Sequence, residues 1–458
     1  MSHTFTLHRG RLADGRLVDL RVVDGALTEV TAVGPGADPS ARGAGAALGA
    51  VDFDAWVADG GAYRGPVDLA GRLVLPPLVN GHVHLDKTFV GAPWQPHRSG
   101  ATVAERVAHE RDLRAEVDVP VAHRAAALAE LLVASGTGLA RTHVDVDPDA
   151  RLAHLEQVLT LREQLVDVLD LQVVAFPQSG IVTAPGVADL LDQGLRLGAD
   201  VVGGLDPAGF DGDAQQHLDV VFALAERHGA RVDIHLHELG AAGGEQLRLI
   251  AERTAALGLH GRVAVSHAYG LGTLGAEETR RCADVLASAG VAVMTNGPAG
   301  PMPPVLLLRE RGVTVFSGTD NVRDAWWPYG DGDMLTIART VAYQQGFRSD
   351  DELGVALDLV TGSAARALGA AGYGLLPGAP ADLVVVEATC AAEAVAAPAR
   401  RTVVRSGVPR SSVATTPVSV PDGTDAPEPS PAAPTHHPDD SAVGQGLRPD
   451  PRLTPSRS

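Results

Sequence analysis

Eight short apolar runs alternate with amphipathic stretches across the middle of the chain, and this alternation constrains the fold more than any other feature. The intervening stretches, such as LAHLEQVLTLREQLV and LDVVFALAERHG, repeat apolar residues every three or four positions, as amphipathic helices do. Eight strand–helix units predict an α/β fold, a (β/α)₈ TIM-like barrel over residues 71–370, with functional residues at the carboxyl ends of the strands. The expected strands are 73–84, 138–146, 170–178, 200–205, 231–238, 262–267, 291–296 and 313–320.

Both ends of this region are flanked by β-rich sequence. Residues 1–70 contain alternating patterns separated by Asp-Gly turns, and residues 371–416 contain the runs LVVV and TVVR, so we expect the two segments to pair into one small β-sandwich domain. Residues 34–65, rich in Ala and Gly, predict a long insertion or mobile loop without regular structure. Residues 417–458 are dominated by Pro, Ser, Asp and Ala, which predicts a disordered tail and makes its His436-His437 pair a weak metal candidate.

Charge and composition narrow the class of partner. The 37 basic and 56 acidic side chains give a formal net charge of −19, with the acidic residues scattered, which argues against nucleic acid or an anionic membrane and favours a small-molecule substrate. No run approaches the ~18 apolar residues of a membrane span, and no signal peptide pattern opens the chain. Cys282 and Cys390 are far apart and suggest neither a disulfide framework nor a thiolate metal site. We expect a cytoplasmic protein, and a homo-oligomer stays open.

The first apolar run ends in His82-Val83-His84. Alternate residues of a strand face the same side, so both imidazoles can converge on one metal ion. A His-x-His alone can also be two histidines on a polar strand face. However, the fifth run ends near His235, the sixth at His267 and the eighth at Asp320. A strand histidine is often a core residue and a terminal Asp often a helix cap, but their coincidence at strand ends favours a metal site.

The motifs around these residues resemble the amidohydrolase superfamily, specifically its cytosine deaminase-like branch. They are LPPLVNGHVHLDKTF, RTHVDVD, DLQVVAFPQSGI, VDIHLHE, AVSHA and SGTDNVRDAWWPYGDGDM, and they cover the whole barrel. The resemblance implies one divalent ion held by His82, His84, His235 and Asp320. Binuclear members bridge two metals with a carboxylated lysine at a middle strand, but Lys87, beside the first strand, is the only lysine here, so a second metal held that way is not expected. A His and Asp shell suits Zn²⁺ or Fe²⁺ and does not choose between them.

The same resemblance implies a hydrolytic mechanism. Glu238 would shuttle protons, while His267 and Asp320 would orient an attacking hydroxide, and Gln178 would grip the substrate ring. We expect attack on a ring carbon that carries an amino group, which gives a ring carbonyl and releases ammonia or an amine.

The substrate follows less directly. Trp94, Trp326 and Trp327 fall in expected loops at the strand ends, where flat walls suit a planar heterocycle, although loop tryptophans can also pack under a barrel rim. Lys87 and Asn321 stand where cytosine deaminases usually carry a small hydroxyl residue and a second Asp. We therefore expect Lys87, Asn321, Gln178 and Trp326 to contact the substrate.

Several functions stay open. The best hypothesis is a cytosine deaminase-like metal-dependent deaminase of an amino-substituted nitrogen heterocycle. The motif DNVRDAWWPYGDGDM looks closer to N-isopropylammelide amidohydrolases of s-triazine breakdown, which would release an alkylamine. A cyclic amide hydrolase and a non-catalytic scaffold barrel are further candidates. His143 and Asp145, on the second strand, are expected behind the metal ligands, and Arg323 and Asp324 either contact substrate or pair with each other.

Overall fold

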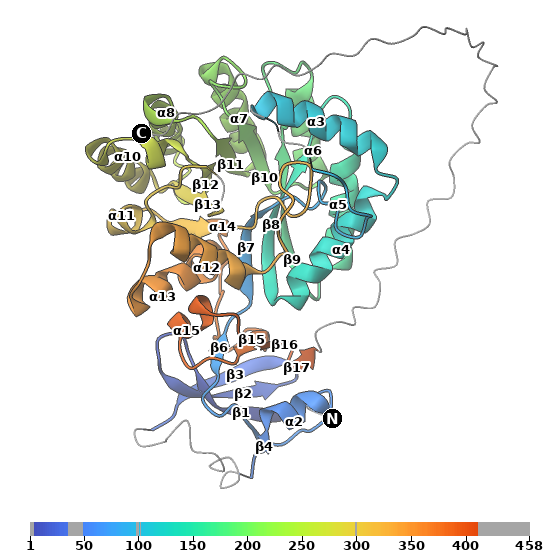
Figure 1. Cartoon of the computed structure of the whole chain (residues 1–458), viewed down its shortest axis with the longest axis vertical. Helices are drawn as coiled ribbons and strands as arrows, with labels where there is room; N and C mark the ends of the chain where they lie inside the picture. Colours follow the sequence, from blue (N-terminus) through green and yellow to red (C-terminus); the bar gives the residue numbers. More distant parts are fainter. Residues whose placement is uncertain (1–3, 35–48, 98–99, 101, 298–299, 411–458) are drawn as a thin grey trace, which may run out of the picture. The chain divides into compact units, whose positions relative to one another are not determined.

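The computed structural model describes residues 4–34, 49–97, 100, 102–297 and 300–410 (Figure 1). Part of the expected insertion, residues 35–48, and the whole expected tail with His436 and His437 lie outside the described residues. Two sheets organise the described chain, one of eight strands and one of nine.

The eight-stranded sheet is a parallel barrel, as predicted. Its strands follow one another in sequence order, each hydrogen-bonded in parallel to the next, and a parallel bridge between Val83 and Asp320 joins the last strand's end to the first. The strands are β7 (Leu78–Val83), β8 (Thr137–Asp145), β9 (Asp170–Phe176), β10 (Val201–Leu205), β11 (Arg231–Leu236), β12 (Val263–His267), β13 (Ala292–Thr295) and β14 (Val315–Ser317).

Glycines allow the barrel to close tightly. A Cβ atom at Gly318 would overlap both the backbone nitrogen and the backbone oxygen of His82, and one at Gly81 would overlap the Phe316 ring. Strands β7 and β14 can therefore approach closely only because neither position carries a side chain. This contact places the ends of the first and last strands, and their polar residues, side by side.

Helices surround the barrel strands (Figure 1). Helix α7 (Ala214–His228) shows how the sequence specifies them: the Asp213 side chain caps its first turn by accepting from the Gln216 amide, Leu218, Val221, Phe222 and Ala225 form its buried face, and it ends at Gly229 in the left-handed conformation. The others are α3 (Val103–Glu116), α4 (Val121–Ala134), α5 (Ala153–Gln164), α6 (Val187–Leu197), α8 (Gly240–Ala256), α9 (Gly270–Thr273), α10 (Ala276–Ala289), α11 (Val305–Glu310), α12 (Met334–Gln345), α13 (Asp350–Asp358) and α14 (Gly362–Leu368). Among the described residues, no helix combines the length and apolar character needed to cross a bilayer.

The nine-stranded sheet joins the two ends of the described chain, as predicted. Strand β15 pairs antiparallel with β6, so the red C-terminal strands and blue N-terminal strands of Figure 1 share one sheet. Its strands are β1 (Thr4–Arg11), β2 (Leu17–Val23), β3 (Ala26–Ala32), β4 (Val51–Asp52), β5 (Val67–Asp68), β6 (Leu73–Leu75), β15 (Leu383–Val386), β16 (Arg401–Arg405) and β17 (Val408–Arg410). Helix α15 (Ala391–Ala396), which the sequence patterns did not predict, lies between β15 and β16.

Two details of the sequence prediction were wrong. The first expected barrel strand, 73–84, is split: Leu73–Leu75 belongs to the small sheet, and the barrel strand starts at Leu78, because Pro76 and Pro77 have no backbone N–H to continue a ladder. The expected loop 34–65 also contains folded structure, since β4 is followed by helix α2 (Phe53–Ala58). Trp56 of α2 is fully buried against Phe5 and Phe53, so this part of the Ala- and Gly-rich segment contributes to the core of the small domain.

Candidate active site

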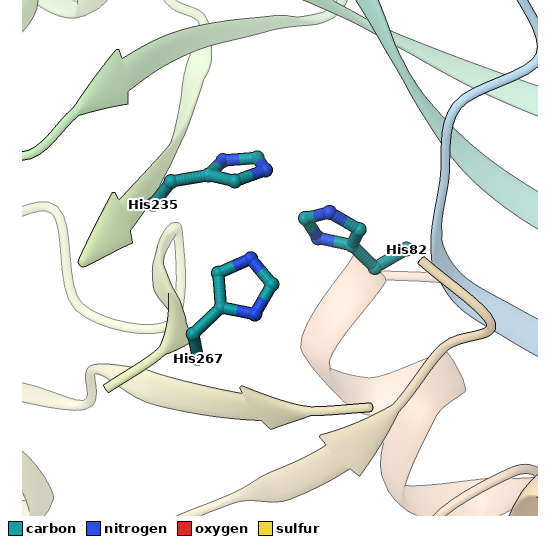
Figure 2. Close-up of side chains that lie close together, drawn as sticks. All are labelled: His82, His235 and His267. Atoms are coloured by element: carbon teal, nitrogen blue, oxygen red, sulfur yellow. The ribbon is translucent and has the colours of Figure 1, made fainter. Parts of the chain in front are cut away.

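The expected metal ligands lie together at the carboxyl ends of the barrel strands. His82 is near the end of β7, His84 follows it, His235 is on β11 and Asp320 comes just after β14. All four are at most 8% exposed. Figure 2 shows the rings of His82 and His235 directed toward one another, with His267, the last residue of β12, beside them.

Distances define three overlapping groups of ligand atoms, all of which include His82. The other members are His84 and Asp320 in the first triad, His235 and His267 in the second, and His143 and Asp233 in the third, and within each triad the ligand atoms lie within 4.8 Å of one another. Asp320 Oδ1 is 3.5 Å from His82 Nε2 and 3.3 Å from His84 Nε2. The ring centroids of His82 and His235 are 4.6 Å apart. The structure thus gathers all four expected ligands around His82, with His267 as a fifth nearby group.

The donor atoms suit a divalent cation. Nε2 of His82, Nδ1 of His84 and both ring nitrogens of His235 are buried and have no hydrogen-bond partner among the described residues, whereas buried polar atoms are ordinarily paired. Burial, followed by repulsion from neighbouring cationic groups, lowers the pKa of His84 and His235, which keeps these imidazoles neutral and able to ligate. Burial alone would raise the pKa of Asp320, but the close approach of His82 and His84 holds it well below its usual value.

A chain of hydrogen bonds fixes the ring of His82. Ser266 donates its hydroxyl hydrogen to Asp233 Oδ1 at 2.7 Å, and Asp233 Oδ2 accepts from Arg141 at 2.7 Å. Ser266 Oγ therefore accepts from Nδ1 of His82, 2.9 Å away, which leaves the lone pair of His82 on Nε2, the atom nearest Asp320. Such support behind a ligand sets its tautomer and orientation.

The two residues expected behind the ligands lie in different surroundings. His143 stacks on His82 with ring centroids 3.8 Å apart, and neither of its ring nitrogens has a hydrogen-bond partner among the described residues. Asp145 Oδ1 lies 3.1 Å from Lys87 Nζ. His143 thus packs against His82, one of the metal candidates, while Asp145 contacts Lys87.

Three strand-end residues adopt a left-handed backbone. The φ angles are 34° at Asp206, 72° at His267 and 56° at Asp320. Non-glycine residues in this region cost about 1–3 kcal/mol each and concentrate at functional sites. The left-handed backbone therefore lies at the carboxyl ends of strands, where the candidate site residues gather.

Glu238 and its neighbour point in different directions. Glu238 Oε1 accepts from the backbone amides of Ala208 at 3.2 Å and Gly209 at 2.6 Å, and burial together with Asp206 raises its pKa. His237, which sequence analysis did not single out as a site residue, lines the cavity beside the metal candidates, and Glu238 is not among the described residues that line it. The alternation of 235 and 237 along one strand was a signal that could have identified His237.

A cavity of about 400 Å³ opens in front of these residues. Part of its wall is formed by the metal candidates His84, His235, His267 and Asp320, and Arg106 of α3 forms another part. Four aromatic rings and the polar side chains expected to bind substrate also line the cavity; they are Phe176, Tyr269, Trp326, Trp327, Lys87, Gln178 and Asn321. Trp94 lies elsewhere, 69% exposed beside a separate, smaller hollow, so its expected place in the wall was wrong. The volume and lining suit a small flat ligand.

Lys87 is the central polar group of this cavity. Its Nζ hydrogen-bonds Gln178 Oε1 and lies 3.6 Å from Glu110 of α3, a residue that sequence analysis missed. The ammonium group also lies 5.3 Å from the centroid of the Phe176 ring and 5.5 Å from that of Trp326. The cation is thus held at a fixed place between two aromatic walls.

Asp324 organises the last loop of the cavity rather than pairing with Arg323. It accepts from Asn321 Nδ2 at 2.6 Å and from the backbone amides of Trp326 and Trp327 at 2.8 and 2.9 Å. Three residues that line the cavity therefore donate hydrogen bonds to the same carboxylate, that of Asp324, which does not itself line the cavity. The indole N–H of Trp326 in turn donates to Glu110 at 2.6 Å, which ties this loop to helix α3.

A parallel eight-stranded barrel that gathers imidazoles and a carboxylate at its strand ends defines a class of metal-dependent hydrolases. The chain belongs to the Amidohydrolase family, whose model matches residues 66–411, and is accordingly a hydrolase acting on non-peptide carbon–nitrogen bonds. It is 31% identical to the N-isopropylammelide isopropyl amidohydrolase of Pseudomonas sp. strain ADP over 71% of this chain and 82% of the relative.

Two solved structures are similar over most of the chain. The N-isopropylammelide isopropylaminohydrolase of Burkholderia multivorans ATCC 17616 is 42% identical, with a TM-score of 0.78, over 89% of this chain and 97% of that one. The 5-methylcytosine deaminase of Klebsiella pneumoniae, bound to 5-fluorocytosine, is 28% identical, with a TM-score of 0.75, over 88% and 96%.

Proposed function

We propose that this protein removes an amine by hydrolysis from a planar nitrogen heterocycle, with one divalent ion, Zn²⁺ or Fe²⁺. The observation that carries the proposal is that two features of the described residues lie together. Buried imidazoles without hydrogen-bond partners lie beside an ionised Asp320, and a cavity walled by aromatic rings lies directly in front of them. His82, His84, His235 and Asp320 would hold the ion. When bound, such an ion supplies a hydroxide-like nucleophile near neutral pH.

The substrate ring would stack between aromatic walls and be oriented by polar side chains. Trp326 and Phe176 offer faces to a planar ring, and Lys87 and Gln178, already in contact, offer a donor and an amide to ring oxygens and nitrogens. Asn321, held by Asp324, would add an amide. These contacts fix which ring carbon faces the ligand cluster.

The remaining residues would move protons. Attack of the water oxygen on the ring carbon forms a C–O bond, and expulsion of the amine breaks the C–N bond. His267 and Asp320 would orient the water. Glu238, once its side chain leaves the amides of Ala208 and Gly209 and turns into the cavity, would take one of the water protons and return it to the departing nitrogen. The buried Oε2 of Glu238, which has no partner among the described residues, and its raised pKa, caused by burial and then by Asp206, suit a group that alternates between charged and neutral forms.

The first candidate ring is an N-alkylated amino-s-triazine of the ammelide type. The greater identity to the N-isopropylammelide isopropylaminohydrolase than to the 5-methylcytosine deaminase, 42% against 28%, supports this choice. A cationic Lys87 also suits a ring with several carbonyl oxygens. An aminopyrimidine is the second candidate, because the 5-methylcytosine deaminase shares the barrel over nearly its whole length.

A substrate panel tests the proposal. Enzyme loaded with Zn²⁺ or with Fe²⁺ is assayed on N-isopropylammelide, ammelide, cytosine and 5-methylcytosine, with ammonia or alkylamine release as the readout. We expect release from at least one ring. A ring-opened product without released amine would indicate cyclic amide hydrolysis, and absence of turnover with every ring and both metals would refute the proposal.

Glu238→Gln tests the proton-shuttle role separately. Loss of a general acid–base group is expected to lower kcat by about 10²–10⁴-fold while metal content stays equal to that of the wild type. Turnover near the wild-type rate would remove Glu238 from this role.

A further inference from the structure

We propose that His237 contacts the substrate through its Nε2 atom and helps to select the ring, and that Asp206 is the positioning residue that fixes His237 in place. The inference rests on the proposed function and names a specificity-determining residue of the same cavity. It starts from the finding that, among the described residues, the imidazole of His237 lines the cavity and the carboxylate of Glu238 does not.

Asp206 holds His237 at two points. Its Oδ2 lies 2.8 Å from Nδ1 of His237, and its Oδ1 accepts from the backbone amide of His237 at 2.6 Å. Asp206 itself is 4% exposed and is anchored by its own amide, which donates to the carbonyl of His235 at 2.9 Å. A carboxylate only accepts hydrogen bonds, so Nδ1 carries the hydrogen of this bond.

Neighbouring rings restrict the remaining freedom of His237. Its ring stacks on that of His267 with centroids 4.6 Å apart and planes at 23°, and it meets the edge of Tyr269 at 5.5 Å. All three residues line the cavity. Among the described residues, Nε2 of His237 has no hydrogen-bond partner, so it is the polar atom that the ring presents to a ligand.

The loop after β10 separates the two neighbouring side chains. The amides of Ala208 and Gly209 hold the Glu238 carboxylate, while Asp206, two residues before Ala208, holds His237. The span from Asp206 to Gly209 therefore determines that an imidazole faces this part of the cavity. A rigid group with one side fixed binds a ligand more tightly than a free side chain does, because little freedom is lost on binding.

The chemistry points to a substrate N–H. In the neutral ring, whose hydrogen is on Nδ1, Nε2 presents a lone pair, and a lone pair accepts from a ring lactam N–H or an exocyclic amine N–H. A ring with a methyl group in place of that hydrogen would leave Nε2 unpaired and would be rejected. Sites that hydrogen-bond their substrates reject analogues that lack the group more strongly than apolar pockets reject an extra methylene.

Three variants separate the Nε2 atom from the bond to Asp206. His237→Asn keeps an amide that can still donate to Asp206 but removes the Nε2 position, whereas His237→Gln places an amide near it. Asp206→Asn weakens the positioning contact and also removes a charge that raises the pKa of Glu238, so KM and ligand binding, rather than kcat, report on the contact. The matched control is Asp192→Asn, which weakens a similar bond between Asp192 and Nε2 of His228, 2.7 Å, that lies outside the cavity lining.

The measurements are KM and kcat on each ring that the wild type hydrolyses, calorimetric binding of cyanuric acid and cytosine, and metal content. We expect His237→Asn to raise KM or the dissociation constant by about 10-fold or more, and His237→Gln and Asp206→Asn by less, all with metal content unchanged. Asp192→Asn should match the wild type.

The outcomes distinguish the inference from the proposed function. If the wild type hydrolyses a ring and His237→Asn hydrolyses it with the same KM, the inference is overturned and the proposed function stays intact. A second outcome is that the wild type turns over none of the rings, but binds cyanuric acid or cytosine more tightly than His237→Asn does. This result would support the inference and refute the proposed function. Absence of both binding and turnover in the wild type would overturn both.

Discussion

Replacing Lys87 by methionine is expected to destabilise the fold, and to do so more at high pH than at low pH. Lys87 is 5% exposed, and its ammonium group lies 3.1 Å from Asp145 and 3.6 Å from Glu110, two side chains that are themselves buried. Methionine keeps the length and the apolar stem but removes the charge. Within the described part of the chain, Asp145 then retains Arg114, at 3.5 Å, as its ion-pair partner.

The magnitude follows from the cost of an unpaired buried charge. Breaking one side of a buried ion pair costs about 3–5 kcal/mol. An unfolding entropy of about 2.1 cal/mol/K per residue gives about 0.8 kcal/mol/K for the roughly 400 described residues. At this entropy the variant should melt about 4–6 °C below the wild type where Asp145 is charged.

The pH dependence has a definite sign. Burial raises the pKa of Asp145 well above its usual value even with Lys87 present, and removing the ammonium group raises it further. A carboxyl group whose folded pKa is raised favours folding at low pH, and this contribution is lost as the pH rises through the folded pKa. Burial alone would lower the pKa of Lys87, but Asp145 and Glu110 raise it, so the lysine stays charged throughout the neutral range.

Thermal unfolding of metal-loaded protein at about pH 5, 6.5 and 8 measures the effect across the range in which a raised carboxyl pKa acts. The deficit of Lys87→Met should be small at the lowest pH and largest at the highest, and the double variant with Asp145→Asn should recover part of it. The control is Arg281→Met, which removes an exposed ion pair with Glu278 and should leave the melting temperature nearly unchanged. A deficit that is the same at all three pH values would refute the electrostatic reasoning.

Three further changes test other parts of the structure. Trp56→Ala empties a fully buried site in the small domain and should cost about 3–5 kcal/mol; a melting temperature equal to that of the wild type would contradict the packing. Gly318→Ala places a Cβ atom against the His82 backbone and should reduce metal content, whereas Gly354→Ala, with nothing within 4 Å, should not; equal metal content in both would refute this. Chelation should abolish activity and lower the melting temperature, and Zn²⁺ or Fe²⁺ should restore both; an unchanged melting temperature would mean that the ligand cluster binds no ion.

The sequence predicts the barrel well because apolar residues are spaced differently in its strands and in its helices. Strand ends are less predictable, since they depend on partners that are distant along the chain. Leu73–Leu75 and Leu78–Val83 form one apolar run, and only their pairing, with β15 and with β8, assigns them to different sheets. Helix α2 was missed because its residues are stabilised by burial of Trp56 in the small domain, and local composition does not show that burial.

The site was predictable where it depends on strand alternation and less so where it depends on loops. His82, on β7, and His84, directly after its last residue, are two positions apart in extended sequence, and the structure gathers them with Asp320. The direction of Glu238, beyond its strand's end, is determined by amides 29 and 30 residues earlier. Glu110 was missed because its contact with Trp326 joins positions 216 residues apart.

Strand topology and backbone strain together explain how these side chains converge. Asp206 and Asp320 both leave their strands in the left-handed conformation, and in each case the backbone amide donates to the carbonyl of a candidate ligand on the next strand, His235 at 2.9 Å and His82 at 2.8 Å. The Asp206 carboxylate accepts a hydrogen bond from the amide of His237, and the Asp320 carboxylate lies beside His82 and His84. The left-handed conformation costs about 1–3 kcal/mol per residue, and the bonds to the strands that carry His235 and His82 offset this cost. These bonds join neighbouring strands, so the strand order that closes the barrel also assembles the candidate active site.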